Sequence, residues 1–157
     1  MSDPLPVAWL GQPGARIGLA ITGYQFAGPV RSGQRDWDAN WLNVRGHVEC
    51  AAGAWSFEDP CLVTWELAAL IDWVEALPDP PGPRIAFTEP LLALSNQSID
   101  DAIVLGVRLG AEALPADRFD EVTRLQLGLT IDLQPSMGQL QRAVQALRAF
   151  LQRYPER

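Results

Sequence analysis

The stretch L-N-V-R-G-H-V-E at residues 42–49 decides the class of fold, because apolar and polar side chains alternate along it. In an extended segment, Leu42, Val44 and Val48 share one face and the polar side chains share the other. Such period-two patterning is typical of a half-buried strand with one face in water, as in an antiparallel sheet. The stretch therefore predicts a strand whose apolar face joins a core.

Similar alternation recurs on both sides of this stretch. The longer predicted strands cover residues 17–21, 103–109 and 125–133. Shorter strands are predicted at residues 54–58, 85–88 and 91–94. In the last of the longer strands, leucine or isoleucine occupies every second position from Leu125 to Leu133, opposite mostly polar residues. Together these segments predict a mostly antiparallel sheet.

Two amphipathic helices are predicted from their capping signals. The first is predicted to begin at Asp59 as the N-cap, with Pro60 in the first helical position, and to end at Pro78. The second is predicted to begin at Ser136, which forms a capping box with Gln139. We therefore predict an α+β fold: a mostly antiparallel, curved or sandwich-like sheet with two amphipathic helices, one mid-chain and one C-terminal.

The length of the chain, 157 residues, suits a single domain spanning 1–157. A domain of this size buries enough surface to fold without a disulfide or a metal. No window approaches about 18 uninterrupted apolar residues, the length of a transmembrane helix, and the segment from Met1 to Pro4 lacks the features of a signal peptide. We therefore expect a cytoplasmic protein without a membrane partner. In that reducing compartment, Cys50 and Cys61 are expected to be small buried thiols.

Negative charge is concentrated in one block, from Asp36 to Glu89. The block holds ten carboxylates and two arginines, a net charge of −8, whereas the whole chain carries −7. An acidic balance argues against nonspecific nucleic-acid binding, which needs basic patches to neutralise phosphates. Five of the six tryptophans fall in the same block: Trp37, Trp41, Trp55, Trp65 and Trp73. We expect a partner-binding surface in this acidic and aromatic region.

The sequence contains no catalytic constellation. Its one histidine, His47, leaves few options for a general base, and the chain lacks the G-x-S-x-G nucleophile motif and both glycine-rich phosphate loops. A zinc site is not expected, because His47 and Cys50 lie an odd number of residues apart and point to opposite faces of a strand. We therefore expect no enzymatic activity, no cofactor and no metal site.

One divalent-metal alternative arises at D-x-D-x-N, residues 36–40, which resembles the opening of an EF-hand loop. An EF-hand needs glycine at the sixth position and glutamate at the twelfth, where this chain has Trp41 and His47. The favoured interpretation is that these residues form a turn leading into a strand. A divalent ion at Asp36 and Asp38, outside any EF-hand, is the remaining alternative.

The tryptophans differ in their expected environments. Trp73 flanks the apolar stripe of the mid-chain helix and is expected in the core, whereas Trp65 lies on another side of that helix. Trp41 shares the polar face of its strand, and Trp37 lies in the acidic turn. Such rings are either partner-binding hot spots or a second small core beneath the loop at residues 27–35. The candidate partner-binding residues are Asp36, Trp37, Asp38, Trp41, Trp65, Glu66 and Asp72.

Three motifs carry a family resemblance: D-W-D-A-N-W-L-N-V at residues 36–44, W-S-F-E-D-P-C-L at 55–62 and E-L-A-A-L-I-D-W-V at 66–74. They resemble the WapI-like family of bacterial immunity proteins, and the similarity extends to F-T-E-P at 87–90 and to the C-terminal strands and helix. The resemblance implies a small, soluble, cytoplasmic protein. It also implies neutralisation of a toxin domain, often an RNase, that a wall-associated contact-dependent system delivers.

Combined with the acidic block, the resemblance leads us to expect an immunity-type protein that binds a cognate basic toxin. The positive cleft of a nuclease is complementary to an acidic surface that contains tryptophan. The alternative is a non-enzymatic binding or structural module that forms a homodimer or binds a small apolar ligand through the same patch.

Overall fold

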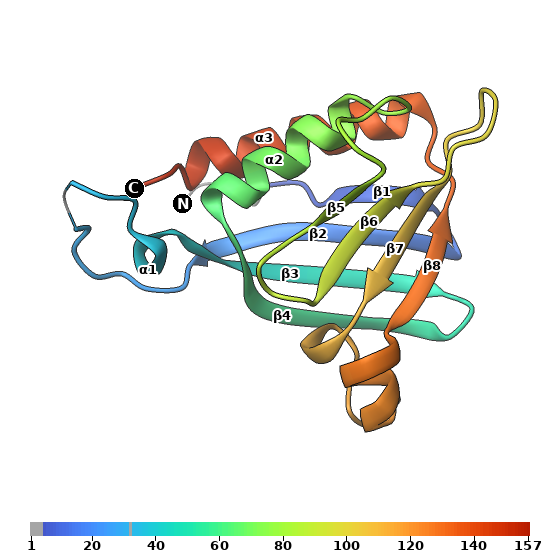
Figure 1. Cartoon of the computed structure of the whole chain (residues 1–157), viewed down its shortest axis with the longest axis horizontal. Helices are drawn as coiled ribbons and strands as arrows, with labels where there is room; N and C mark the ends of the chain where they lie inside the picture. The colour runs from blue at the N-terminus through green and yellow to red at the C-terminus, as the bar shows by residue number, and fades with distance from the viewer. Residues whose placement is uncertain (1–4, 32) are drawn as a thin grey trace.

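The computed structural model describes residues 5–31 and 33–157, and it confirms an α+β fold with antiparallel strands. The strands of the described residues form two four-stranded sheets (Figure 1). The first sheet contains, in spatial order, β1 (Ala8–Gln12), β2 (Ala15–Tyr24), β3 (Trp41–Cys50) and β4 (Gly53–Val63). The second contains β5 (Arg84–Ala86), β6 (Leu92–Asn96), β7 (Leu105–Leu109) and β8 (Leu129–Leu133).

The helices are α1 (Trp37–Asn40), α2 (Thr64–Glu75) and α3 (Met137–Arg153), with a 3-10 turn η1 (Ala111–Ala113) and a π-helical turn η2 (Thr123–Leu127). Figure 1 shows α2 and α3 side by side along one side of the two sheets. The capping box predicted for α3 is confirmed. Ser136 Oγ accepts a hydrogen bond from the Gln139 N–H at 3.1 Å, and Gln139 Oε1 accepts one from the Ser136 N–H at 2.9 Å.

One cluster of buried side chains joins both sheets to α2 and α3. The strand predicted at residues 42–49 lies in β3 with its apolar face inward: Leu42 and Val44 are fully buried, whereas Arg45 is exposed. Trp73 is a core residue, as predicted, with 2% of its surface exposed. Its indole N–H donates to the carbonyl of Gly82 at 3.1 Å, so the ring also holds the loop after α2.

The mid-chain helix begins later than predicted, because Asp59 and Pro60 continue β4 instead of capping a helix. β4 stays paired with β3 as far as Val63, and the register shifts where Pro60 and Cys61 lie opposite Asn43. A bulge on an edge strand tolerates the missing N–H of proline. α2 then begins at Thr64, where Glu66 Oε1 accepts a hydrogen bond from the Val63 N–H at 3.1 Å. Strand pairing therefore overrode the local Asp-Pro signal.

The strand predicted at residues 125–133 is also corrected, because only Leu129–Leu133 forms β8. The residues before it form η2, and Leu125 and Leu127 are 61% and 67% exposed instead of contributing to the core. Gly128 separates the two elements with φ +70°, a backbone conformation that side-chain-bearing residues rarely adopt. The leucine alternation therefore spans a change of secondary structure.

A strand that the sequence did not predict, β1, pairs with β2 through a tight hairpin whose turn residues are Pro13 and Gly14. This segment carries little alternation, since Gly11 and the turn interrupt the pattern. β1 forms one edge of the first sheet and packs against α3.

Both cysteines are free thiols, with Cys61 buried as predicted and Cys50 only half-buried. Burial, reinforced by the nearby Asp59 carboxylate, raises the pKa of Cys61 to about 12. The part of the chain that the structure describes contains no helix both long and apolar enough to span a membrane. The expectation about a signal peptide concerns Met1 to Pro4, which lie outside the described residues.

Candidate partner-binding surface

The three tryptophans predicted to bind a partner come together around α1. This short helix lies at one end of the molecule (Figure 1). The ring of Trp37 meets that of Trp65 edge-on, with centroids 4.8 Å apart and planes at 87°, and it lies 6.1 Å from Trp41. Trp37 is 46% exposed. We call Trp37, Trp41 and Trp65 the tryptophan cluster.

The loop between β2 and α1 covers part of this cluster. The Arg35 guanidinium lies 4.3 Å from the centroid of the Trp65 ring, a cation–π arrangement. Trp65 is consequently half-buried, whereas Trp37 presents its ring to solvent. The rings therefore pack together beside this loop, and Trp37 remains exposed. That they bind a partner stays a prediction.

Asp36, although a candidate for partner binding, uses its carboxylate to organise α1. Its oxygens accept hydrogen bonds from the backbone N–H groups of Arg31 at 2.8 Å and Ala39 at 3.2 Å. These backbone bonds lower the pKa of Asp36 below its usual value. The residue is 9% exposed and acts as the N-cap of α1. By capping α1, its carboxylate holds in place the helix that carries Trp37.

Asn40 is a site residue that the sequence assigned to a turn. Its side chain is fully buried and makes four hydrogen bonds. The amide nitrogen donates to the carbonyls of Asp36 at 2.7 Å and Arg157 at 3.0 Å. The amide oxygen accepts from the Thr64 hydroxyl at 2.9 Å and from the Arg157 N–H at 2.9 Å. Asn40 thus links α1, the first residue of α2 and the segment after α3.

The segment after α3 also holds the loop that covers the cluster. The Arg157 side chain donates to the carbonyls of Ala39 at 2.7 Å and Phe26 at 2.8 Å, and its guanidinium lies 3.9 Å from the centroid of the Tyr24 ring. Glu156 forms an ion pair with Arg35 at 3.2 Å. No local sequence pattern indicates these contacts, because they join residues at opposite ends of the chain.

The two remaining acidic candidates on α2 have different environments. Glu66 is half-buried, and its second carboxylate oxygen accepts hydrogen bonds from the Thr88 N–H at 2.7 Å and hydroxyl at 3.0 Å. It therefore ties α2 to the segment that precedes β6. Asp72 is exposed about two helical turns beyond Trp65. Neither side chain is brought into the cluster.

Beside Trp41 the surface is hollowed, with a volume of about 390 Å³. Four carboxylates line this hollow, and they come from α1, β4, the segment before β6 and η1: Asp38, Asp59, Glu89 and Glu112. Phe26 and Trp41 supply aromatic walls. None of the four carboxylates forms an ion pair with an arginine in residues 5–31 and 33–157. We call this set the acidic hollow.

Burial, and then the charges of Glu112 and Glu89, raise the pKa of Asp59 above its usual value of 3.8. A carboxyl group whose pKa is raised by folding costs stability once it ionises in the native state. We therefore expect Asp59→Asn to be more stable than the wild type at neutral pH. The difference should vanish below about pH 4 and grow as pH rises through the native pKa of Asp59.

Urea unfolding of both proteins between pH 4 and pH 7 measures this difference. Glu89→Gln is the matched control for loss of one charge from the hollow, and it should produce a smaller gain because Glu89 is only one of the causes of the Asp59 shift. A difference between wild type and Asp59→Asn that stays constant across this pH range would contradict the assignment.

Among the described residues, no three or more histidine, cysteine, aspartate or glutamate side chains are placed to hold a metal ion together. The carboxylate of Asp36 faces backbone amides, and Asp38 faces the acidic hollow. His47 Nδ1 lies 2.9 Å from the Ser56 hydroxyl on the outer face of the first sheet. The arrangement as a whole presents an exposed indole beside a hollow of unpaired negative charge, which suits a cationic protein surface.

Comparison with known proteins gives one family and one similar structure. The model of the Immunity protein WapI-like family matches residues 9–155. No curated protein matches the sequence. Among solved structures, the chain is similar to the plant transcriptional regulator PBF-2, with a TM-score of 0.51 and 14% sequence identity over 98% of this chain and 84% of that chain. At this identity the likeness concerns the fold alone.

Proposed function

This chain belongs to the WapI-like immunity protein family, and on this premise we propose that it binds and neutralises a cognate basic toxin. The binding surface that we propose comprises the tryptophan cluster and the acidic hollow. The protein acts in the cytoplasm and by binding, without catalysis of its own. One observation carries the choice of surface: Asp38 and Trp41 line the acidic hollow, and Trp41 also belongs to the cluster that exposes Trp37.

Electrostatics supports a basic partner. A nuclease must attract phosphate, so the mouth of its active site is positive, and the acidic hollow offers the opposite charge. Complementary fields of this kind mainly accelerate association and exclude wrong partners. The aromatic walls of the hollow, Phe26 and Trp41, favour a guanidinium or ammonium group, because cations are attracted to ring faces.

The exposed ring of Trp37 supplies the apolar anchor of the proposed interface. Tryptophan is enriched among the few residues that dominate binding energy, and such residues lie in rigid settings that exclude water. Trp37 is held by Trp65 on one side and by the short helix α1, whose N-cap is Asp36. Because these supports are already formed in the free protein, little ordering cost remains for association.

The proposal is tested by coexpression with a basic toxin domain, for which the product of a neighbouring gene is the first candidate to examine. Growth should be rescued by the wild type, and the purified proteins should form a complex. A toxin that remains fully active in the presence of excess protein would contradict the proposed function. A complex that forms but leaves the toxin active would support the proposed toxin binding and contradict the proposed neutralisation.

Reversing charge in the acidic hollow should slow association with that toxin. We expect the double variant Asp38→Lys and Glu112→Lys to lower the association rate constant about tenfold or more at low salt, with a smaller effect at high salt, because screening weakens long-range steering. Stopped-flow mixing at two ionic strengths measures this change.

The matched control carries the same change of net charge outside the hollow, at the exposed residues Asp101 and Asp132. It should slow association only slightly. Equal slowing in the two double variants would show that net charge, and not the acidic hollow, steers the partner.

A further inference from the structure

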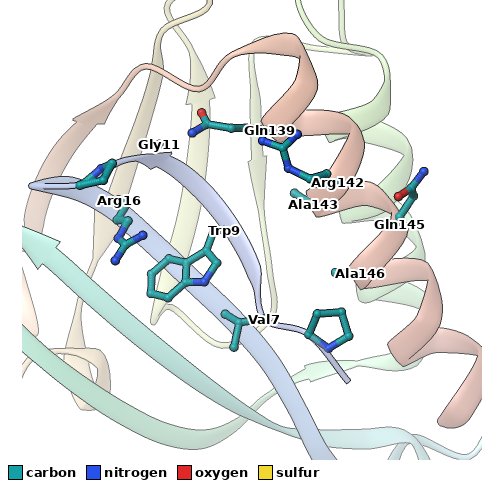
Figure 2. A pocket seen from close by; sticks show the side chains of 11 residues that line it. Val7, Trp9, Gly11, Arg16, Gln139, Arg142, Ala143, Gln145 and Ala146 are labelled. Atoms are coloured by element: carbon teal, nitrogen blue, oxygen red, sulfur yellow. The ribbon is translucent and has the colours of Figure 1, made fainter. Parts of the chain in front are cut away.

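A second hollow lies on another part of the molecule, between the β1–β2 hairpin and α3 (Figure 2). Its volume is about 510 Å³, within the range of small-molecule pockets. None of its lining residues belongs to the tryptophan cluster or the acidic hollow. We call it the β1–α3 groove.

Apolar and aromatic side chains line much of this groove. Val7 and Trp9 border it on the hairpin side, and the small side chains of Ala143 and Ala146 border it on α3. The Trp9 ring lies over Gly18, where any Cβ would stand 2.9 Å from ring atoms. The groove therefore contains an indole held in a fixed position, which suits contact with a flat organic molecule.

The groove carries positive charge, although the protein as a whole is acidic. Of the three arginines of α3, only Arg142 lines the groove, and Arg148 forms an ion pair with Glu75 outside it. Arg16, on the hairpin, stacks on Trp9 at 4.1 Å and is neutralised by Glu49 at 2.8 Å. Arg142 forms no ion pair or hydrogen bond within residues 5–31 and 33–157.

The polar side chains that α3 contributes to the groove point in different directions. Figure 2 shows Gln139 and Arg142 projecting from α3 toward the hairpin, whereas Gln145 points away. The Gln139 oxygen is already used by the Ser136 N–H and by the Gln12 amide. Of the two arginines that line the groove, Arg142 is the one without an ion-pair partner in residues 5–31 and 33–157, and a guanidinium binds a carboxylate in a bidentate manner.

We propose that the β1–α3 groove binds a small organic anion, in which an aromatic body carries one carboxylate. The aromatic body lies against Trp9 and Val7, and the carboxylate pairs with Arg142. This site is independent of toxin binding, so it stands whether or not the proposed function does.

The probes are 2-naphthoate and its neutral isostere 2-naphthamide, titrated into isotope-labelled protein and followed by amide chemical shifts. We expect saturable shifts for 2-naphthoate at residues 7–18 and 139–146. The neutral amide should bind about tenfold more weakly, because it forms no charge-assisted pair with Arg142.

Arg142→Gln should weaken 2-naphthoate binding about tenfold and leave 2-naphthamide binding unchanged. Arg118→Gln, which removes an exposed arginine outside the groove, is the matched control and should bind both probes like the wild type. The proposal is overturned by the absence of saturable shifts, by shifts centred elsewhere on the molecule, or by equal 2-naphthoate affinity of Arg142→Gln and wild type.

Discussion

Replacing Asn40 with alanine is expected to reduce the free energy of unfolding by about 3 kcal/mol and to lower the Tm by roughly 6–12 °C. The Asn40 amide is fully buried and makes four hydrogen bonds, to Asp36, Thr64 and Arg157. Alanine removes all four and leaves the buried Thr64 hydroxyl and several backbone groups without partners, at a cost of about 1 kcal/mol each. Urea and thermal unfolding, followed by circular dichroism, measure the loss.

Asn43→Ala is the matched control for this substitution. Asn43 is a half-buried residue of β3, the strand that follows α1, and its side chain makes one long hydrogen bond, 3.5 Å to the carbonyl of Tyr24. Its replacement should cost less than about 1 kcal/mol. Equal losses in the two variants would show that the Asn40 network contributes no more than an ordinary peripheral amide.

The Asn40 substitution should also change the environment of Trp65. Because Arg157 holds the carbonyl of Phe26 and Glu156 pairs with Arg35, loss of the Asn40 contacts should loosen the loop that covers Trp65. The tryptophan emission of the folded variant is then expected to shift to longer wavelength. An unchanged emission spectrum would indicate that the loop keeps its position without Asn40.

Replacing Trp37 with alanine is expected to weaken binding to the cognate toxin by about 2–4 kcal/mol, or roughly 30- to 1000-fold. The ring is 46% exposed and held edge-on by Trp65, so it offers apolar surface without prior rearrangement. The stability cost should be only about 1 kcal/mol, the size of an aromatic pair contact. Calorimetric titration with the toxin domain, together with urea unfolding, measures both quantities.

Leu127→Ala is the control for removal of an exposed apolar side chain, because Leu127 is 67% exposed in η2, outside the cluster and the hollow. It should leave toxin affinity unchanged. If Trp37→Ala binds the toxin as tightly as the wild type, the tryptophan cluster is not the anchor. If Leu127→Ala instead weakens binding, the interface lies around η2.

The choice of Trp37 and Asp38 for these tests, instead of the other candidates, comes from the contacts of each side chain. Asp36 and Glu66 accept backbone hydrogen bonds that hold α1 and α2, so their replacement would disturb the fold as well as any interface. Sequence position alone does not separate an acidic side chain that caps a helix from one that faces solvent. The acidic surplus of residues 36–89 therefore contained both kinds.

Much of the architecture was predictable because its signals are local. Alternation at residues 42–49 and the capping box at Ser136 each depend on neighbouring residues, and both appear in the structure as predicted. The errors arose where a distant partner decided the outcome. Pairing with β3 kept Asp59 and Pro60 in β4, and η2 replaced the first half of the strand predicted at residues 125–133.

The sequence by itself determined the α+β class, the identity of the core helices and the family to which the chain belongs, since periodicity, capping residues and family motifs are properties of contiguous residues. Only the tertiary structure decided which acidic and aromatic residues share a surface. Glu89 and Glu112 join Asp38 in one hollow through the packing of separate elements. Asn40 meets Arg157 across 117 positions of sequence, a contact that depends on the packing of the whole fold and leaves no trace in either local segment.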